Sequence, residues 1–156
     1  MSVDCVLCQE PGGRLVFSCP QFRLIHATEP GLEAFYRIIW NAHVPEWSDL
    51  PEAQRWLCMQ AVAVVEQAMR DVLAPRKINI ASLGNHVPHL HWHVIARFDW
   101  DGYFPAPVWA QPHTAPEQLP QDKVAHVRSL RTALEEQMLA QLTPLAEAAA
   151  ASQPQH

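Results

Sequence analysis

Hydrophobic residues recur along this chain with two different periods, and each period predicts its own kind of element. Short runs rich in aromatic and β-branched residues are typical of strands. Five such runs lie at residues 14–19, 22–27, 34–40, 77–83 and 89–98. A turn at residues 20–21 separates the first two runs, and we expect all five to form strands.

Two longer segments repeat apolar residues with the period of an α-helix. The first covers about residues 49–73, where Asp49 is the expected N-cap, Glu52 has the capping-box spacing and Pro51 falls in the first turn. The second covers about residues 121–142. The first segment has one apolar stripe, formed by Leu57, Ala61, Val64, Val65, Ala68 and Val72. Between the last strand and the second helix, the prolines of residues 99–120 predict an irregular surface excursion.

Composition narrows the classes of protein that fit. The chain has 156 residues, of which 49% are hydrophobic and 17% charged, as in a globular domain with a modest core. Its net charge is −5 with only 11 scattered Lys and Arg, so we expect no DNA or RNA partner. No apolar run is long enough to span a bilayer, and no secretory signal is visible. We therefore expect no membrane association and a cytoplasmic location.

Three histidines stand at alternate positions in the last predicted strand. Side chains alternate between the two faces of a strand, so His89, His91 and His93 should share one face, opposite Leu90 and Trp92. A row of three imidazoles fits poorly with a purely structural role, because each buried ring nitrogen needs a partner. The row could bind zinc, or it could supply a neutral imidazole that attacks phosphorus. Periodicity does not decide between these two chemistries.

Four cysteines are present, and two of them have the spacing of a zinc half-site. Cys5 and Cys8 form a Cys-x-x-Cys pair near the N-terminus. This spacing alone fits two buried thiols equally well, because a free cysteine packs as a small apolar residue.

The histidine strand closely resembles the signature of a known family. The run at residues 89–95 reads His-Leu-His-Trp-His-Val-Ile, which matches the motif His-φ-His-φ-His-φ-φ (φ, apolar) of histidine triad (HIT) proteins at every position. Leu-Gly-Asn-x-x-Pro at residues 83–88 and Phe-Pro-x-Pro-x-Trp at residues 104–109 resemble a bacterial branch akin to diadenosine polyphosphate hydrolases. The resemblance extends over about residues 5–112.

The resemblance implies both a fold and an activity. The implied fold is α+β and HIT-like, with an antiparallel sheet of about five strands, one long helix and a C-terminal helix, usually in a homodimer. The implied activity is a nucleotide hydrolase or transferase that releases a nucleoside monophosphate from a dinucleoside polyphosphate, a phosphoramidate or an adenylate. His91 would be the nucleophile, and His93 would bind the phosphate and assist the leaving group. The substrate is a small nucleotide, and catalysis requires no cofactor.

Two segments depart from the better-known branches of the family. Those branches hold the phosphate with a longer loop that ends in Gly-Gln-Ser/Thr-Val, whereas this loop is short, and Asn85 and His86 are the candidate replacements. Those branches also carry an acidic residue for the ribose, and residues 26–29 offer no clear match to it. Trp109 could lie near the nucleotide, but we expect it to pack the excursion onto the sheet.

The resemblance also suggests a ligand set for a structural metal. In some bacterial members, a cysteine pair joins the histidine before the long helix and the first histidine of the triad. Here these residues are Cys5, Cys8, His43 and His89. Such a Cys₂His₂ set would bind zinc in a closed, structural site.

The sequence also predicts how the chain is divided into a domain, an extension and a tail. By the resemblance, we expect residues 1–112 to form a HIT domain, residues 113–145 a helical extension packed on that domain, and residues 146–156 a flexible tail. Two alternatives to the hydrolase stay open: a non-catalytic nucleotide-binding protein, and a metal-dependent hydrolase that uses the histidine strand as its ligands.

Overall fold

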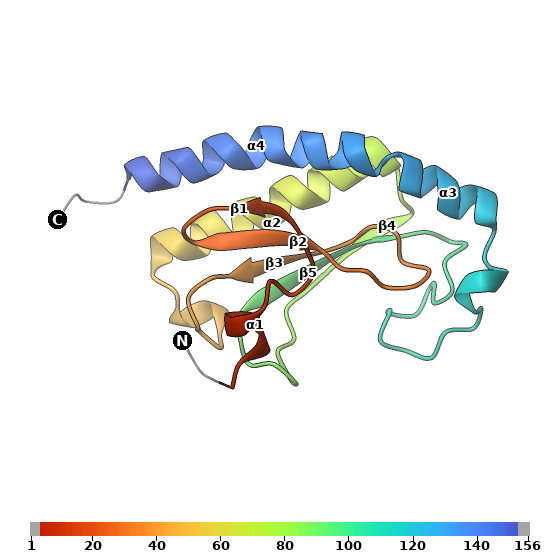
Figure 1. Cartoon of the computed structure of the whole chain (residues 1–156), viewed down its shortest axis with the longest axis horizontal. Coiled ribbons are helices and arrows are strands. Elements are labelled where there is room, and N and C mark those ends of the chain that lie inside the picture. Colours follow the sequence, from red (N-terminus) through yellow and green to blue (C-terminus); the bar gives the residue numbers. More distant parts are fainter. Residues whose placement is uncertain (1–3, 153–156) are drawn as a thin grey trace.

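The computed structural model describes residues 4–152, which form a five-stranded antiparallel sheet with helices packed on it (Figure 1). The strand order is β1-β2-β3-β5-β4, so β5 lies between β3 and β4. The strands are β1 (Arg14–Ser18), β2 (Phe22–His26), β3 (Phe35–Trp40), β4 (Lys77–Ala81) and β5 (His91–Arg97). This arrangement confirms the predicted α+β fold and its sheet of about five strands.

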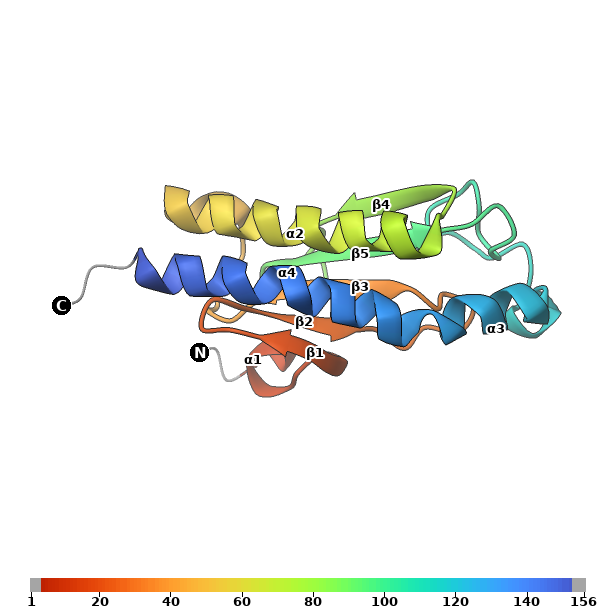
Figure 2. The same cartoon turned by 90° about the horizontal axis from the view of Figure 1, so that it is seen from above.

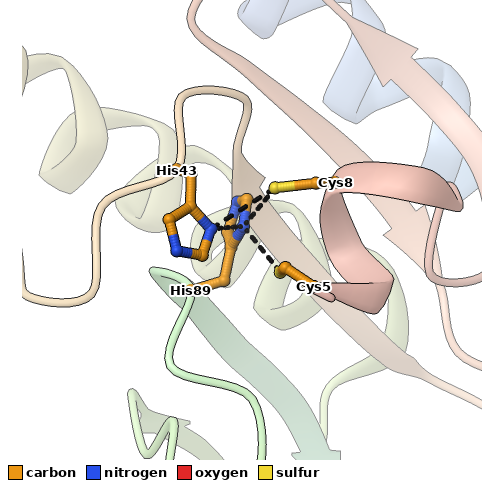
Figure 3. A group of neighbouring side chains, drawn as sticks. All are labelled: Cys5, Cys8, His43 and His89. Atoms are coloured by element: carbon orange, nitrogen blue, oxygen red, sulfur yellow. Dashed lines mark hydrogen bonds between the residues drawn. The ribbon is translucent and has the colours of Figure 1, made fainter. Parts of the chain in front are cut away.

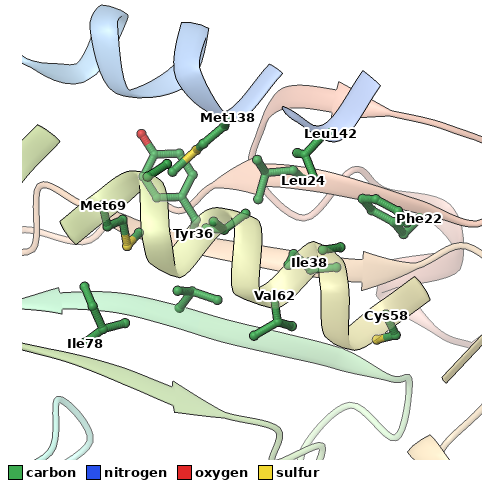
Figure 4. Packing of buried hydrophobic residues seen from close by; sticks show 14 of the residues in the cluster. Phe22, Leu24, Tyr36, Ile38, Cys58, Val62, Met69, Ile78, Met138 and Leu142 are labelled. Atoms are coloured by element: carbon green, nitrogen blue, oxygen red, sulfur yellow. The ribbon is translucent and has the colours of Figure 1, made fainter. Parts of the chain in front are cut away.

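The helices place the main core on one face of the sheet. The long helices α2 (Glu52–Leu73) and α4 (Arg131–Ala151) lie side by side over that face (Figure 2). Each large apolar side chain buried there contributes about 1.5–3 kcal/mol. The side chains that meet between sheet and helices include Phe22, Leu24, Tyr36, Ile38, Cys58, Val62, Met69, Met138 and Leu142 (Figure 4). The opposite face carries only a smaller apolar cluster, which leaves room there for polar side chains.

The start of α2 differs from the prediction. The helix begins at Glu52 after Pro51, and Asp49 does not cap it. Proline fixes its own φ (here −54°) and has no N–H to contribute to the preceding turn, so the chain separates into two elements at this point. Asp49 instead ends the short 3₁₀ helix η1 (Trp47–Asp49), where it forms a capping box with Glu46.

The last strand is shorter than predicted. β5 begins at His91. The Leu90 carbonyl still accepts from the Trp40 N–H of β3, but the Leu90 N–H donates to the Val44 carbonyl in the loop after β3. His89 therefore precedes the strand, and its own N–H donates to the Val87 carbonyl. A simple period-two pattern does not reveal that the Leu90 N–H bonds outside the sheet.

The C-terminal segment forms two helices where the sequence predicts one. α3 (Gln121–Ser129) ends at Leu130, and α4 then continues to Ala151, into the stretch that we expected to be a flexible tail. Leu134, Met138 and Leu142 of α4 are buried against the core, and beyond Pro144 the helix still packs on it through the partly buried Leu145 and Ala149. Residues 153–156 of the expected tail lie outside the described part of the chain. Within residues 4–152, none of the helices has the length and apolarity needed to cross a membrane.

A buried ion pair attaches the excursion after β5 to the sheet. The Arg97 guanidinium donates to both carboxylate oxygens of Asp101, at 2.9 and 3.0 Å, and each residue is 1% exposed. Arg97 also donates to the Asn79 side chain and to the Ala106 carbonyl, while Asp101 accepts three backbone N–H groups. Every polar group of the pair therefore has partners, and the following loop is fixed in place.

Removing the carboxylate should leave a buried cation without its counter-charge. We expect Asp101→Ala to lower the free energy of unfolding by about 3–5 kcal/mol. Urea denaturation followed by circular dichroism measures this change. Asp99→Ala is the matched control, because Asp99 is an exposed carboxylate two positions earlier. Equal losses in the two variants would contradict the structural role assigned to the ion pair.

Candidate active site

His91 and His93 lie on β5, near the centre of the sheet, and face away from the two long helices. Ile39 and Ile95, which share their face, belong to the smaller apolar cluster, whereas Val94 belongs to the main core. His91 is 9% exposed and His93 is 6% exposed. Their imidazole rings stand edge to face, with centroids 4.9 Å apart. The predicted alternation therefore holds for these two histidines.

A backbone carbonyl determines which nitrogen of His91 is free. The Nδ1 atom of His91 lies 2.6 Å from the His89 carbonyl oxygen. Because a carbonyl only accepts, Nδ1 must carry the proton, and Nε2 keeps its lone pair. Burial lowers the pKa of His91 further than the hydrogen bond to the His89 carbonyl raises it. His91 is therefore neutral near pH 7, which is the state that a nucleophile needs.

A cavity of about 550 Å³ opens in front of both imidazoles. Asn85 and His86, the predicted phosphate-binding residues, line it from the loop between β4 and β5. Gly84 allows this loop to turn, because its φ of +73° is in the left-handed region. The structure thus brings the two loop residues to the same cavity as His91 and His93.

Two further residues line the cavity, and one of them, Arg37, did not follow from the sequence. Arg37 lies opposite His93 in the β3–β5 pairing, and its Nε donates to Nδ1 of His93 at 3.3 Å. The Trp109 ring lies 5.2 Å from the His93 ring and is half exposed. Trp109 therefore packs the excursion onto β5, as expected, and its ring also forms part of the cavity wall. Alternation places Arg37 on the same face of β3 as Ile39, but only the pairing of β3 with β5 shows that its neighbour is His93.

His89 belongs to a different cluster, next to the active-site cavity. Its Nε2 donates to the Trp40 carbonyl at 2.6 Å, which leaves Nδ1 as the unprotonated nitrogen. That Nδ1 faces Cys5 Sγ at 3.4 Å, Cys8 Sγ at 3.6 Å and His43 Nδ1 at 3.2 Å (Figure 3). The structure thus groups the four residues that the resemblance suggests as metal ligands.

The spacing of this cluster suits a tetrahedral ion. Zinc–ligand bonds of about 2.0–2.1 Å to nitrogen and 2.3 Å to sulfur imply nitrogen–nitrogen edges of about 3.3 Å and nitrogen–sulfur edges of about 3.6 Å. Four of the six edges match these values: 3.2 Å between the two histidines and 3.3–3.6 Å for three histidine–cysteine contacts. All four ligand atoms lie within 4.8 Å of one another. The residues present therefore fit a bound metal ion.

Arg23, on β2, holds the cysteine segment against the sheet. Its guanidinium donates to the carbonyl of Leu7, within the short helix α1 (Val6–Gln9), and to those of Glu10 and Pro11, which follow that helix. These bonds compensate for the small size of α1, which contributes no buried side chain of its own. Arg23 thereby helps to place Cys8 near the two histidines.

The three histidines of the motif do not converge on one point. His91 directs Nδ1 at a carbonyl, His93 directs Nδ1 at Arg37, and His89 faces the cysteines. Across residues 4–152, the one group of three or more His, Cys, Asp or Glu side chains placed to share a metal is the Cys5 cluster. This geometry does not fit a metal site built from the histidine strand.

Solved structures with this fold come from several bacteria. A histidine triad protein from Bradyrhizobium japonicum is 27% identical, over 78% of this chain and 90% of that protein, with a TM-score of 0.61. A histidine triad protein from Marinobacter aquaeolei is 23% identical, over 82% of this chain and 92% of that protein, also with a TM-score of 0.61. A zinc-bound histidine triad family protein from Mycobacterium smegmatis is 19% identical, over 87% of this chain and 99% of that protein, with a TM-score of 0.57.

The sequence also matches a family model. No match to the chain was found among curated proteins. The model of the HIT domain matches residues 9–100, which is more than half of the chain and includes the whole histidine motif. The chain therefore belongs to the HIT domain family.

Proposed function

We propose that this protein is a nucleotide hydrolase or transferase that cleaves a nucleoside monophosphate from its substrate through a covalent histidine–nucleotide intermediate. The observation that carries the proposal is the state of His91. Its Nδ1 is held by the His89 carbonyl at 2.6 Å, and the ring lines a cavity large enough for a nucleotide. A nucleophile needs this combination of an available lone pair and space for the reacting atom.

The reaction then has two displacements at the α-phosphorus. In the first, Nε2 of His91 attacks phosphorus, and the electron pair of the broken bond leaves with the rest of the substrate. In the second, water attacks phosphorus and the histidine is released. The His89 carbonyl stabilises the positive charge that develops on the substituted ring, because it accepts the Nδ1 proton throughout.

The neighbouring polar residues supply binding to the phosphate. His93, Asn85 and His86 line the cavity next to His91. We propose that they donate hydrogen bonds to the phosphoryl oxygens, which gain charge during the attack. Trp109, at the cavity wall, offers an aromatic surface to the nucleoside.

Several finer features extend this proposal. The loop and Trp109 segments favour the bacterial branch akin to diadenosine polyphosphate hydrolases. We also propose a homodimer, a cytoplasmic location and no nucleic-acid partner. The net charge of −5 and the small cavity favour a small nucleotide over a polymeric one.

Loss of the nucleophile should abolish turnover and leave the fold intact. We expect His91→Ala to lower the rate of AMP release from diadenosine tetraphosphate or adenosine 5′-phosphoramidate by roughly 10⁴-fold or more. EDTA added to the assay should not change the wild-type rate, because imidazole performs the attack. Chromatography of released AMP measures both effects, and calorimetric titration with AMP checks that the variant still binds nucleotide.

His126→Ala is the matched control for this experiment. It removes an exposed imidazole of α3 that does not line the active-site cavity, so its rate should equal that of the wild type. Full activity in His91→Ala would rule out the proposed chemistry. Nucleotide binding by the wild type with no turnover of either substrate would favour the non-catalytic alternative.

We further propose that Cys5, Cys8, His43 and His89 hold one structural zinc ion. The supporting observations are the close approach of the four ligand atoms, with four of their six distances at tetrahedral values, and the hydrogen bond from His89 Nε2 to the Trp40 carbonyl. That bond orients the ring and directs its free nitrogen at the cluster. The zinc-bound relative from Mycobacterium smegmatis shares the fold. Such an ion would connect α1 to the loops before α2 and before β5.

Loss of one thiol should release the metal. We expect Cys8→Ser to lower the zinc content from about one ion per chain to nearly none. If the site contributes about 3 kcal/mol, the midpoint of thermal unfolding should fall by roughly 10 °C. Plasma mass spectrometry and scanning calorimetry measure the two effects. Cys19→Ser, at a half-buried thiol outside the cluster, should retain its zinc; a wild type that carries no metal would overturn the proposal.

A further inference from the structure

A permanently charged side chain lies inside the proposed active site. Arg37 lines the cavity in front of His91 and also a second cavity of about 240 Å³, which has Trp109 in common with the first. The Arg37 guanidinium stacks over the Phe35 ring at 5.0 Å. Its side chain is only 24% exposed, so solvent screens its charge incompletely. An anionic group bound beside His93 would therefore lie close to this cation.

Arg37 determines the tautomer of His93. A guanidinium has only donors, so in the 3.3 Å contact Arg37 Nε must donate and His93 Nδ1 must accept. The proton of the neutral ring is then on Nε2. His91 has the opposite tautomer, with its proton on Nδ1. The two adjacent rings therefore provide one lone pair for attack and one N–H for hydrogen bonding.

His93 can donate a hydrogen bond but has no spare proton. Burial, together with the nearby His91 and the Arg37 charge, lowers the pKa of His93 to about 3, so the ring is neutral near pH 7. A neutral ring that lost its Nε2 proton would become an anion. Its role is therefore to stabilise negative charge on the departing group, rather than to protonate that group.

The nearby carboxylate does not cancel the positive charge. Glu29 is paired with Arg37 at 3.5 Å, and its side chain is 44% exposed. Pairs this long and this exposed contribute little free energy. The guanidinium thus keeps donors available for a phosphate, which it can bind in a bidentate manner.

We propose that Arg37 makes the site selective for substrates whose leaving group departs as an anionic polyphosphate, over substrates that lose an amine. This inference rests on the proposed hydrolase function and specifies its substrate class. When His91 Nε2 bonds to the α-phosphorus, the phosphorus–oxygen bond breaks and its electron pair stays on the leaving phosphate, which needs no proton. Water then adds to phosphorus, the nitrogen–phosphorus pair returns to His91, and the water proton passes to solvent.

An amine leaving group has the opposite requirement. The nitrogen of a phosphoramidate must gain a proton before or while the phosphorus–nitrogen bond breaks, because an amide anion is a very poor leaving group. The site places a fixed cation and a neutral imidazole beside that nitrogen, and neither supplies a proton readily. The same residues that favour a phosphoanhydride therefore slow the cleavage of a phosphorus–nitrogen bond.

Two Arg37 variants test this inference on the full chain. Arg37→Met keeps the length of the apolar stem but removes the charge and the donors, and Arg37→Lys keeps the charge. We expect Arg37→Met to lower kcat/KM for diadenosine tetraphosphate roughly 100-fold, as for the loss of one preorganised donor, and that for adenosine 5′-phosphoramidate only a few-fold. Arg37→Lys should recover part of the loss. Arg128→Met, at an exposed arginine outside both cavities, is the matched control.

A spectroscopic measurement separates this role from a merely structural one. The ¹⁵N chemical shifts of the His93 ring should report the Nε2–H tautomer in the wild type and a mixture in Arg37→Met. Equal losses for both substrates, or an unchanged tautomer together with an unchanged substrate ratio, would overturn the inference. If the wild type cleaves the phosphoramidate only, the inference fails while the hydrolase proposal stands. If it cleaves neither substrate, the hydrolase proposal fails and this inference fails with it.

Discussion

The antiparallel pairing of β3 with β5 is the constraint on which the site depends. Its register places Ile39 opposite His91 and Arg37 opposite His93. Beyond the last paired residues, the backbone N–H of Trp40 bonds to Leu90 and its carbonyl accepts from the His89 ring. A shift of one residue would turn both active-site histidines toward the helices. The buried apolar residues on both faces of β3 and β5 make such a shift costly.

His89 links the proposed metal cluster to the proposed nucleophile. Its side chain faces Cys5 and Cys8, while its own carbonyl holds the Nδ1 proton of His91. The position of this one residue therefore affects both the cluster and the tautomer of His91. In the proposed mechanism the first histidine of the motif need not touch the substrate: its backbone carbonyl would act on His91, and its ring would help to hold the loop through the proposed metal cluster.

The sequence predicts the elements better than it predicts their boundaries. Periodicity located the strands and α2, because strand and helix patterns differ over many residues. It placed the start of β5 too early, because it does not show that the Leu90 N–H bonds to Val44 outside the sheet. It also missed the break at Leu130 between α3 and α4. It also placed the cap of α2 at Asp49, because spacing alone does not show that Pro51 already separates two elements.

The same limits apply to the site. The motif identified His91 and His93, and the resemblance grouped Cys5 with the other proposed ligands across long stretches of sequence. Arg37 escaped notice, because its importance comes from a neighbour on another strand. For Trp109 the sequence suggested both packing and a place near the nucleotide, and it could not show that the ion pair between Arg97 and Asp101 fixes the segment that follows β5. Long-range contacts of this kind are visible only in the folded chain.

The central claim of this account is a covalent intermediate on His91, and the stereochemistry at the α-phosphorus tests it most directly. The substrate would be a dinucleoside polyphosphate with a chiral α-phosphorothioate, hydrolysed in ¹⁸O-labelled water. Two successive in-line displacements, by His91 and then by water, predict overall retention of configuration. Overall inversion would mean a single attack by water, and it would contradict the role assigned to the His91 imidazole.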